Sequence, residues 1–150
     1  MPTTFTPIKP DEADAWLAVA QGAQLADEGV FWRKAKAGQS LQEGLAFALR
    51  VGGEIVGTVM LVQTLYDQPQ TASIFALAVT PDQMGKGYGK RILDESCTFL
   101  RRQGITQVRL FTSMAQGFYK QTGFQPFGTL PLANKEYKFY YKNISKDAAD

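Results

Sequence analysis

The chain has 150 residues, 45% of them apolar, and a net charge of +2 from 16 basic and 14 acidic residues. This length and composition predict a single domain over residues 1–150, and the balanced charge argues against a nucleic-acid partner. Because the chain has no histidine and only one cysteine, Cys97, we expect no internal disulfide, no metal site of the usual zinc type and no Ser-His-Asp catalysis.

The N-terminal part predicts a short extended segment followed by helices. Residues 1–16, "MPTTFTPIKPDEADAW", lack the basic-then-apolar pattern of a signal peptide, and no later apolar run reaches the roughly 18 residues of a membrane span. We therefore expect a cytoplasmic protein without a membrane partner. A helix is predicted over residues 11–24 with Asp11 as its N-cap, and a second helix over residues 25–38.

The middle of the chain predicts strands. Apolar residues alternate in residues 43–51, "EGLAFALRV", and a two-glycine turn separates them from residues 54–65, "EIVGTVMLVQTL", so the pair predicts a hairpin. Gly57 inside the second strand is the predicted position of a bulge. The run at residues 71–79, "TASIFALAV", is apolar almost throughout, which is typical of a central, buried strand.

The C-terminal half predicts a helix over residues 90–104 that ends at Gly104, a strand over 107–111, a short helix over 113–123 and a last strand over 137–144. Helices, an antiparallel hairpin and a strand-helix-strand crossover together predict an α+β (α/β three-layer) domain.

The stretch at residues 78–93, "AVTPDQMGKGYGKRIL", places glycines on alternate positions at the start of a predicted helix. Such a link can be only a tight turn. Here, however, cations flank the glycines at the helix N-terminus, where the macrodipole is already positive, so they are unfavourable unless an anion binds. Glycine backbone can also approach a ligand closely, so a phosphate or pyrophosphate site is the better interpretation. The patterns G-x-x-x-x-G-K-[ST] and G-x-G-x-x-G of nucleotide sites do not match.

Two motifs resemble the GNAT acyltransferase superfamily. Residues 77–93, "LAVTPDQMGKGYGKRIL", resemble its acyl-CoA-binding motif, in which a strand ending in L-x-V-x-P precedes [QR]-G-x-G-x-[GA]. Residues 115–124, "AQGFYKQTGF", resemble its downstream A-x-x-[LF]-Y-x-x-x-G-F segment. The resemblance covers residues 43–144 in element order. It implies a mixed, mainly antiparallel sheet of about six to seven strands flanked by about four helices, and acetyl transfer from acetyl-CoA directly to a primary amine of a small molecule or peptide.

The resemblance also implies the site residues. The pyrophosphate of acetyl-CoA is expected on the glycine loop, and the pantetheine arm along the buried strand, where a bulge parts two parallel strands. The residues implied to contact the cofactor are Leu77, Ala78, Val79, Met84, Gly85, Lys86, Gly87, Tyr88, Gly89, Lys90 and Thr112. Tyr119 matches the tyrosine often assigned as general acid to the thiolate, and a phenol with a pKa near 10 is protonated at neutral pH. The alternative role for Tyr119 is a core aromatic. A homodimer through the C-terminal strands would fit this class.

Some positions depart from the family pattern. Met84 replaces its usual Gln or Arg, Thr112 replaces a frequent Asn, and the strand at residues 71–79 lacks the glutamate of many members. The amine would then lose its proton to a water chain or to a distant carboxylate such as Asp67 or Glu28, or would have a low pKa. These departures keep two alternatives open: a non-catalytic acyl-CoA-binding or sensing module, and a phosphate-binding domain unrelated to CoA.

Aromatic side chains in the first two predicted helices and the loop after the hairpin could form a wall for the amine or belong to the core. They are Trp16, Phe31, Trp32 and Tyr66. Cys97 shares a helical face with Ile92 and Leu93, which predicts a buried small hydrophobe and not a nucleophile.

Overall fold

A computed structural model describes residues 2–22, 40–41, 43–64, 70–112, 116–132 and 135–144. Its strands are β1 (Thr3–Pro7), β2 (Leu45–Val51), β3 (Glu54–Thr64), β4 (Thr71–Val79), β5 (Gln107–Thr112), β6 (Gln125–Leu132) and β7 (Lys135–Asn143). Its helices are α1 (Ala13–Gly22), α3 (Tyr88–Arg102) and α4 (Gln116–Gln121), with short 3₁₀ turns η1 (Pro10–Glu12) and η3 (Pro81–Gln83). The helix predicted over residues 25–38 lies outside the described residues. None of the helices in these ranges is long and apolar enough to cross a bilayer.

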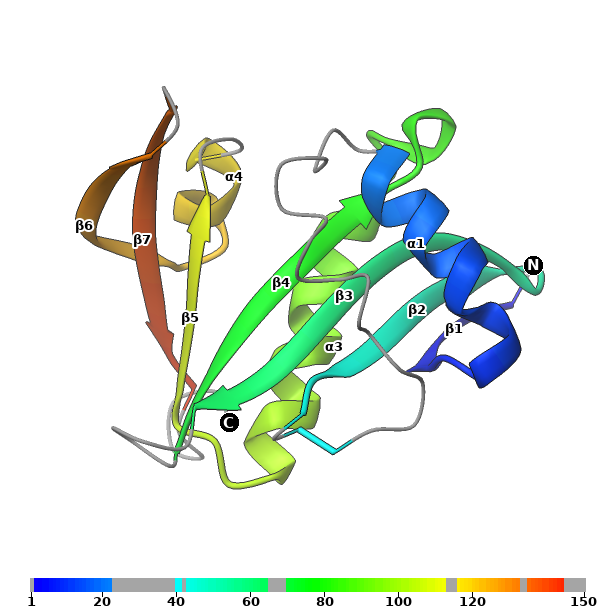
Figure 1. Cartoon of the computed structure of the whole chain (residues 1–150), viewed down its shortest axis with the longest axis horizontal. Helices are drawn as coiled ribbons and strands as arrows, with labels where there is room; N and C mark the ends of the chain where they lie inside the picture. The colour runs from blue at the N-terminus through cyan, green and yellow to red at the C-terminus, as the bar shows by residue number, and fades with distance from the viewer. Residues whose placement is uncertain are drawn as a thin grey trace.

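The strands form one seven-stranded sheet in the order β1-β2-β3-β4-β5-β7-β6 (Figure 1). All neighbouring pairs are antiparallel except β4 and β5, which are parallel, so the predicted mixed and mainly antiparallel sheet is confirmed. The prediction missed β6 because Pro126, Gly128 and Pro131 interrupt its pattern. Prolines are tolerated there because β6 is an edge strand with one partner only.

The sheet is covered by α3 on one face and by α1 on part of the other (Figure 1). The buried side of α3 carries Ile92, Leu93, Ser96, Cys97 and Leu100, so the predicted core face and the buried position of Cys97 are confirmed. On the opposite face, the buried residues of α1 pack against small side chains of β2 and against one buried residue each from β3 and β4. The residues of this cluster on the helix and these strands are Trp16, Ala20, Ala46, Ala48, Met60 and Ala76. This arrangement is the predicted three-layer domain.

Gly57 allows α3 to approach β3 closely. A Cβ built on Gly57 would lie 2.5 Å from the Cδ1 of Ile92 and 3.3 Å from the carbonyl oxygen of Ala78. The predicted bulge is confirmed beside this residue, because β2 and β3 change register there and Val56 is the additional residue on β3. The glycine therefore serves both the bend in the strand and the helix–sheet contact.

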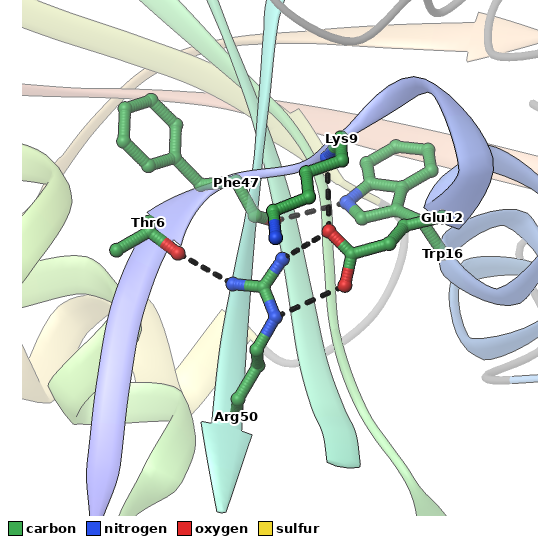
Figure 2. Close-up of polar contacts among 6 residues, drawn as sticks. All are labelled: Thr6, Lys9, Glu12, Trp16, Phe47 and Arg50. Carbon is green, nitrogen blue, oxygen red and sulfur yellow. Dashed lines mark hydrogen bonds and ion pairs between the residues drawn. The ribbon is translucent and has the colours of Figure 1, made fainter. Parts of the chain in front are cut away.

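An ion pair fixes the segment before α1 to β2 (Figure 2). The guanidinium of Arg50 donates from Nη2 and Nε to the two carboxylate oxygens of Glu12, and from Nη1 to the Thr6 hydroxyl. Two hydrogen bonds lower the pKa of Glu12 below its usual value. The larger effect comes from the Arg50 side chain, and the smaller from the Lys9 amide at 2.9 Å. Because its geometry is bidentate, this partly buried pair stabilises the fold more than an ordinary surface ion pair does.

The helix start differs from the prediction. Asp11 is not the N-cap, because it lies inside the 3₁₀ turn that Pro10 opens, with Lys9 preceding it. Proline suits the first position of a helical turn because its missing N–H has no partner there in any case. Further along α1, the indole Nε1 of Trp16 donates to the Phe47 carbonyl at 2.9 Å, which fixes this fully buried side chain (Figure 2).

A bulge in β4 reshapes the centre of the sheet. Between Thr58 and Met60, β3 has one residue where β4 has two, Ala76 and Leu77. Ala76 adopts a positive φ of 58°, which is unfavourable for a residue with a Cβ. The buried hydroxyl of Thr58 donates to the Ala76 carbonyl at 2.7 Å and so stabilises the distorted backbone.

The bulge coincides with the parting of β4 and β5. The two parallel strands pair only over Thr71–Ser73 and Gln107–Arg109, and they diverge beyond these residues (Figure 1). The opening that the family resemblance implied is thus present between the C-terminal ends of β4 and β5.

We predict that Thr58→Val lowers the free energy of unfolding by about 1 to 2 kcal/mol, because the buried Ala76 carbonyl loses this donor. Urea denaturation followed by tryptophan fluorescence measures the effect. Thr129→Val, on exposed β6, is the control and should change the value by no more than about 0.5 kcal/mol. Equal effects of the two substitutions would contradict the assigned role of Thr58.

Candidate functional site

The glycine loop leaves its backbone accessible. The turn η3 leads from β4 into residues 84–87, and α3 begins at Tyr88. Gly85 and Gly87 both have a φ of +82°, and a Cβ built on either would meet nothing within 4 Å. Glycine adopts this left-handed conformation without strain, which explains the residue type at both positions. The open space on this side leaves room for a ligand to reach the backbone.

The backbone amides of residues 85–90, which we call the amide loop, have no acceptor among the described residues. The Met84 amide donates to the Pro81 carbonyl at 3.4 Å, so the open amides begin after Met84. The first bond of the helix runs from Arg91 to the Gly87 carbonyl at 3.1 Å, and Gly87 supplies no side-chain cap. A helix start whose orphan N–H groups are left uncapped is a ready anion site.

Cationic side chains surround the amide loop, and the first turn of α3 contains no acidic residue. Lys90 and Arg91 each pair with a carboxylate one turn further on, Asp94 at 3.0 Å and Glu95 at 3.6 Å. The ammonium of Lys86 instead donates to a side-chain amide oxygen at 3.0 Å. These exposed pairs screen the cations weakly, so the positive potential of the helix N-terminus is kept for an anion.

The edge of β4 beyond Ser73 is a second open stretch of backbone. Ala78 and Val79 pair with Thr58 and Gly57 on the β3 side. On the other side, pairing with β5 has already ended at Ser73. The edge formed by Leu77, Ala78 and Val79 therefore lacks a strand partner among the described residues, and an extended amide chain could pair with it.

Tyr119 lies on α4, which packs against the start of α3 through Phe118. The residue is 8% exposed and belongs to the buried core, and its ring packs against Phe118, Phe124 and Tyr140 with centroid distances of 5.2, 5.8 and 6.1 Å. The neighbouring Phe118 ring lies 3.4 Å from the place of a Cβ on Gly89, so α4 packs against the start of α3. The structure thus places Phe118, the neighbour of Tyr119 in the chain, against Gly89 at the end of the amide loop, although the two segments are distant in the sequence.

Other predicted residues lie elsewhere. Thr112 is the last residue of β5 and pairs with Lys138, at the parted end of the two strands. Trp16 is fully buried in the core, so the wall role considered for it is wrong. Burial raises the pKa of the Cys97 thiol, which makes it a poor nucleophile. Glu28, Phe31, Trp32, Tyr66 and Asp67 lie outside the described residues.

Two neighbouring cavities that the sequence did not predict lie over β4, β5, β7 and β6. Their volumes are about 240 and about 250 Å³. Arg109 and Phe127 line both of them. Their other lining residues are Gln107 and Tyr141 in the smaller, and Ser73, Phe75, Leu110, Phe111 and Phe139 in the larger. The only sequence signal was Arg109 itself, a charge inside a predicted strand.

Neither cavity is lined by a described carboxylate. In the described ranges, no three His, Cys, Asp or Glu side chains are grouped so that they could hold a metal ion. The polar side chains that line the two cavities are therefore uncharged, apart from the Arg109 guanidinium.

The sequence matches the model of the acetyltransferase (GNAT) family over residues 9–124. A protein of Streptococcus pyogenes described as an uncharacterized acetyltransferase is 30% identical over 76 residues, which are 50% of this chain and 52% of that protein. The chain thus spans about half the length of the curated relatives it matches.

Solved structures share the fold. The ribosomal-protein-S18-alanine N-acetyltransferase of Escherichia coli superposes with a TM-score of 0.76 at 17% identity, covering 99% of this chain and 98% of that one. The PaiA N-acetyltransferase of Thermoplasma acidophilum, solved in complex with coenzyme A, gives a TM-score of 0.72 at 16% identity and covers 95% and 99%. At these identities the likeness concerns the fold.

We predict that Gly87→Ala weakens coenzyme A binding about tenfold, because a Cβ at this φ shifts the amide loop. Isothermal titration calorimetry measures the dissociation constant. Gly53→Ala is the matched control, since Gly53 has a φ of +86° and equally open surroundings but lies in the β2–β3 turn. Both variants should lose about 1 kcal/mol of stability. The assignment of the loop would be contradicted if both variants lost affinity equally, or if both kept the affinity of the unmodified protein.

Proposed function

Because the chain belongs to the acetyltransferase (GNAT) family, we propose that it is an N-acetyltransferase that moves an acetyl group from acetyl-CoA directly to a primary amine of a small molecule or peptide. One observation carries the proposal: the amides of residues 85–90 lead on from the edge of β4, and neither has a partner among the residues that the structure describes. A diphosphate and an extended amide chain, joined in one molecule, are the chemical groups that coenzyme A would present to these two surfaces.

The residues fit this cofactor. The amides from Gly85 to Lys90 would hold the diphosphate, with the Lys86 ammonium beside them. The edge formed by Leu77, Ala78 and Val79 would pair with the pantetheine amides as an added strand. When bound, the cofactor supplies an acyl group activated as a thioester. The protein's part is to hold that group between the parted strands.

Tyr119 is the proposed general acid for the leaving thiolate. It lies on α4, next to the Phe118 that packs on Gly89, and aromatic neighbours fix its ring. A phenol with a pKa near 10 is protonated at neutral pH and can give its proton to a thiolate. Because its position depends on packing and not on a flexible loop, the hydroxyl would be held in a reproducible place.

The amine must be neutral to attack. A lysine-like amine with a pKa near 10.4 is neutral in fewer than about one molecule in a thousand at pH 7. Since β4 carries no carboxylate, the proton would leave through water, and an acceptor amine of lower pKa is favoured.

The second candidate is a non-catalytic acyl-CoA-binding module. The absence of a carboxylate on β4 and the presence of Met84 before the loop favour it, because both remove groups that many family members use. Two further expectations stay predictions. One is a cytoplasmic location. The other is a homodimer, for which β6 at the sheet edge, with Phe127 and Leu130 exposed, is the suitable surface.

Turnover separates the two candidates. We predict that acetyl-CoA with a panel of amino acids, polyamines, amino sugars and short peptides yields thiol release above the acceptor-free rate with at least one amine. A chromogenic thiol reagent measures the rate, and calorimetry measures acetyl-CoA binding. Binding without release across the panel would support the binding module. No binding of acetyl-CoA would contradict both candidates.

We predict that Tyr119→Phe lowers kcat about 10- to 100-fold and leaves the dissociation constant of acetyl-CoA nearly unchanged, because only the proton donor is removed. Tyr140→Phe is the matched control. Tyr140 is the buried neighbour of Tyr119, and its hydroxyl has no partner among the described residues, so this variant should keep both values. A parallel loss of affinity and turnover in Tyr119→Phe would indicate a structural role.

A further inference from the structure

The larger cavity lies where β4 and β5 part. Ser73 is the last residue of β4 that pairs with β5, and Phe75 is the next residue on the same side of the strand. Both line this cavity, together with Arg109 and Phe111 of β5. An inference about its ligand rests on the proposed function, which places the acyl group between these strands.

Aromatic rings form the walls of the cavity. Phe111 packs edge-on against Phe75 with a centroid distance of 5.9 Å and lies 5.8 Å from Phe139. Phe127, which is 51% exposed, lies 5.8 Å from the same Phe139 ring. A volume of about 250 Å³ is below the usual range for drug-sized ligands, about 300 to 1,000 Å³. The walls therefore fit the apolar part of a small molecule.

Arg109 supplies the one charge that lines the cavity among the described residues. Its Nε donates to the Gln107 side chain at 2.7 Å, and its guanidinium carbon lies 5.9 Å from the centre of the Phe127 ring. No described carboxylate pairs with it, whereas Arg50 and Arg91 each have an acidic partner. A half-buried guanidinium whose terminal nitrogens have no hydrogen-bond partner in the described part of the chain is suited to bind a carboxylate in the bidentate manner.

We propose that the acceptor is a small primary amine that carries a carboxylate and an apolar side group, as an α-amino acid does, and that Arg109 binds the carboxylate. The aromatic walls take the side group. In the transfer, the amine nitrogen forms a bond to the acyl carbon, the carbon–sulfur bond breaks, Tyr119 protonates the thiolate and water takes the amine proton. The guanidinium of Arg109 also offsets the negative charge of the carboxylate. This lowers the pKa of the acceptor's own ammonium group, so a larger fraction of the acceptor amine is neutral.

Matched acceptors test the proposal. Thiol release is measured with L-phenylalanine and L-phenylalaninamide, and with L-leucine and L-leucinamide. In each pair the amide has the same side group and lacks the negative charge of the acid. The comparison is conservative, because the amides have the more acidic ammonium group and so the larger neutral fraction. We expect kcat/KM to be about 10- to 100-fold higher for the acids, as for hydrogen bonds to a charged group, mainly through KM.

Variants identify the residue. In Arg109→Gln, the ratio of kcat/KM for acid over amide should fall to about one or below, because the amide has the larger neutral fraction. Arg109→Lys should give an intermediate ratio, since it keeps the charge and loses the planar fork. Arg102→Gln, at an exposed position on α3, is the matched control and should keep the ratio of the unmodified protein. Thermal unfolding by circular dichroism checks the fold, and Arg109→Lys carries the comparison should Arg109→Gln be unfolded.

The outcomes separate this inference from the proposed function. Amides equal to or better than acids, or a ratio unchanged in the Arg109 variants, would overturn the carboxylate site while acetyl transfer stands. Should no amine be acetylated at all, the proposed function fails, and calorimetry of the acids and amides against the coenzyme A-loaded protein decides the site. The carboxylate site is supported if the acids bind and Arg109→Gln loses this binding. It is overturned if acids and amides bind equally, or if the acids do not bind.

Discussion

The hydrogen bond from Thr58 to the Ala76 carbonyl stabilises the feature on which the rest of this site depends. A regular β4 would continue to pair with β5, and a closed sheet has no room for a ligand between its strands. The extra residue in β4, with Ala76 in a strained conformation, accompanies the end of that pairing. The buried hydroxyl offsets part of the strain by giving the displaced carbonyl a donor. The opening is therefore part of the folded sheet and needs no moving loop to form.

Two kinds of polar surface lie beside the opening between β4 and β5. On one side are backbone groups: the edge of β4 and the open amides of the loop before α3. Backbone recognition tolerates changes in side chains, which explains how the loop can keep its geometry with Met84 in place of the family's usual Gln or Arg. On the other side are side chains, with the Arg109 guanidinium among aromatic rings. Such groups discriminate by charge and shape, so donor and acceptor would be recognised by different means.

Charge is distributed in accordance with this division. Arg50 pairs with Glu12, and Lys90 and Arg91 pair along α3, so these cations have local structural partners. The backbone amides of residues 85–90 and the guanidinium of Arg109 have no partner among the described acidic residues. Positive groups without acidic partners, placed beside open volume, are where anions gain the most from binding. The same criterion connects both proposals, although they concern different parts of the site.

The sequence by itself determined the features that depend on local chemistry. The alternating glycines require an open backbone before α3, the two-glycine turn joins β2 to β3, and the helical period of residues 92–100 places Cys97 in the core. Only the tertiary structure decided how the segment before α1 is fixed to β2, through the Arg50–Glu12 pair. It also decided that β6 is an edge strand, where its prolines are tolerated. The Arg109 cavity likewise depends on the register of four strands, because its lining residues come from segments far apart in the chain. Local patterns report local backbone geometry, whereas a cavity is a property of which strands become neighbours.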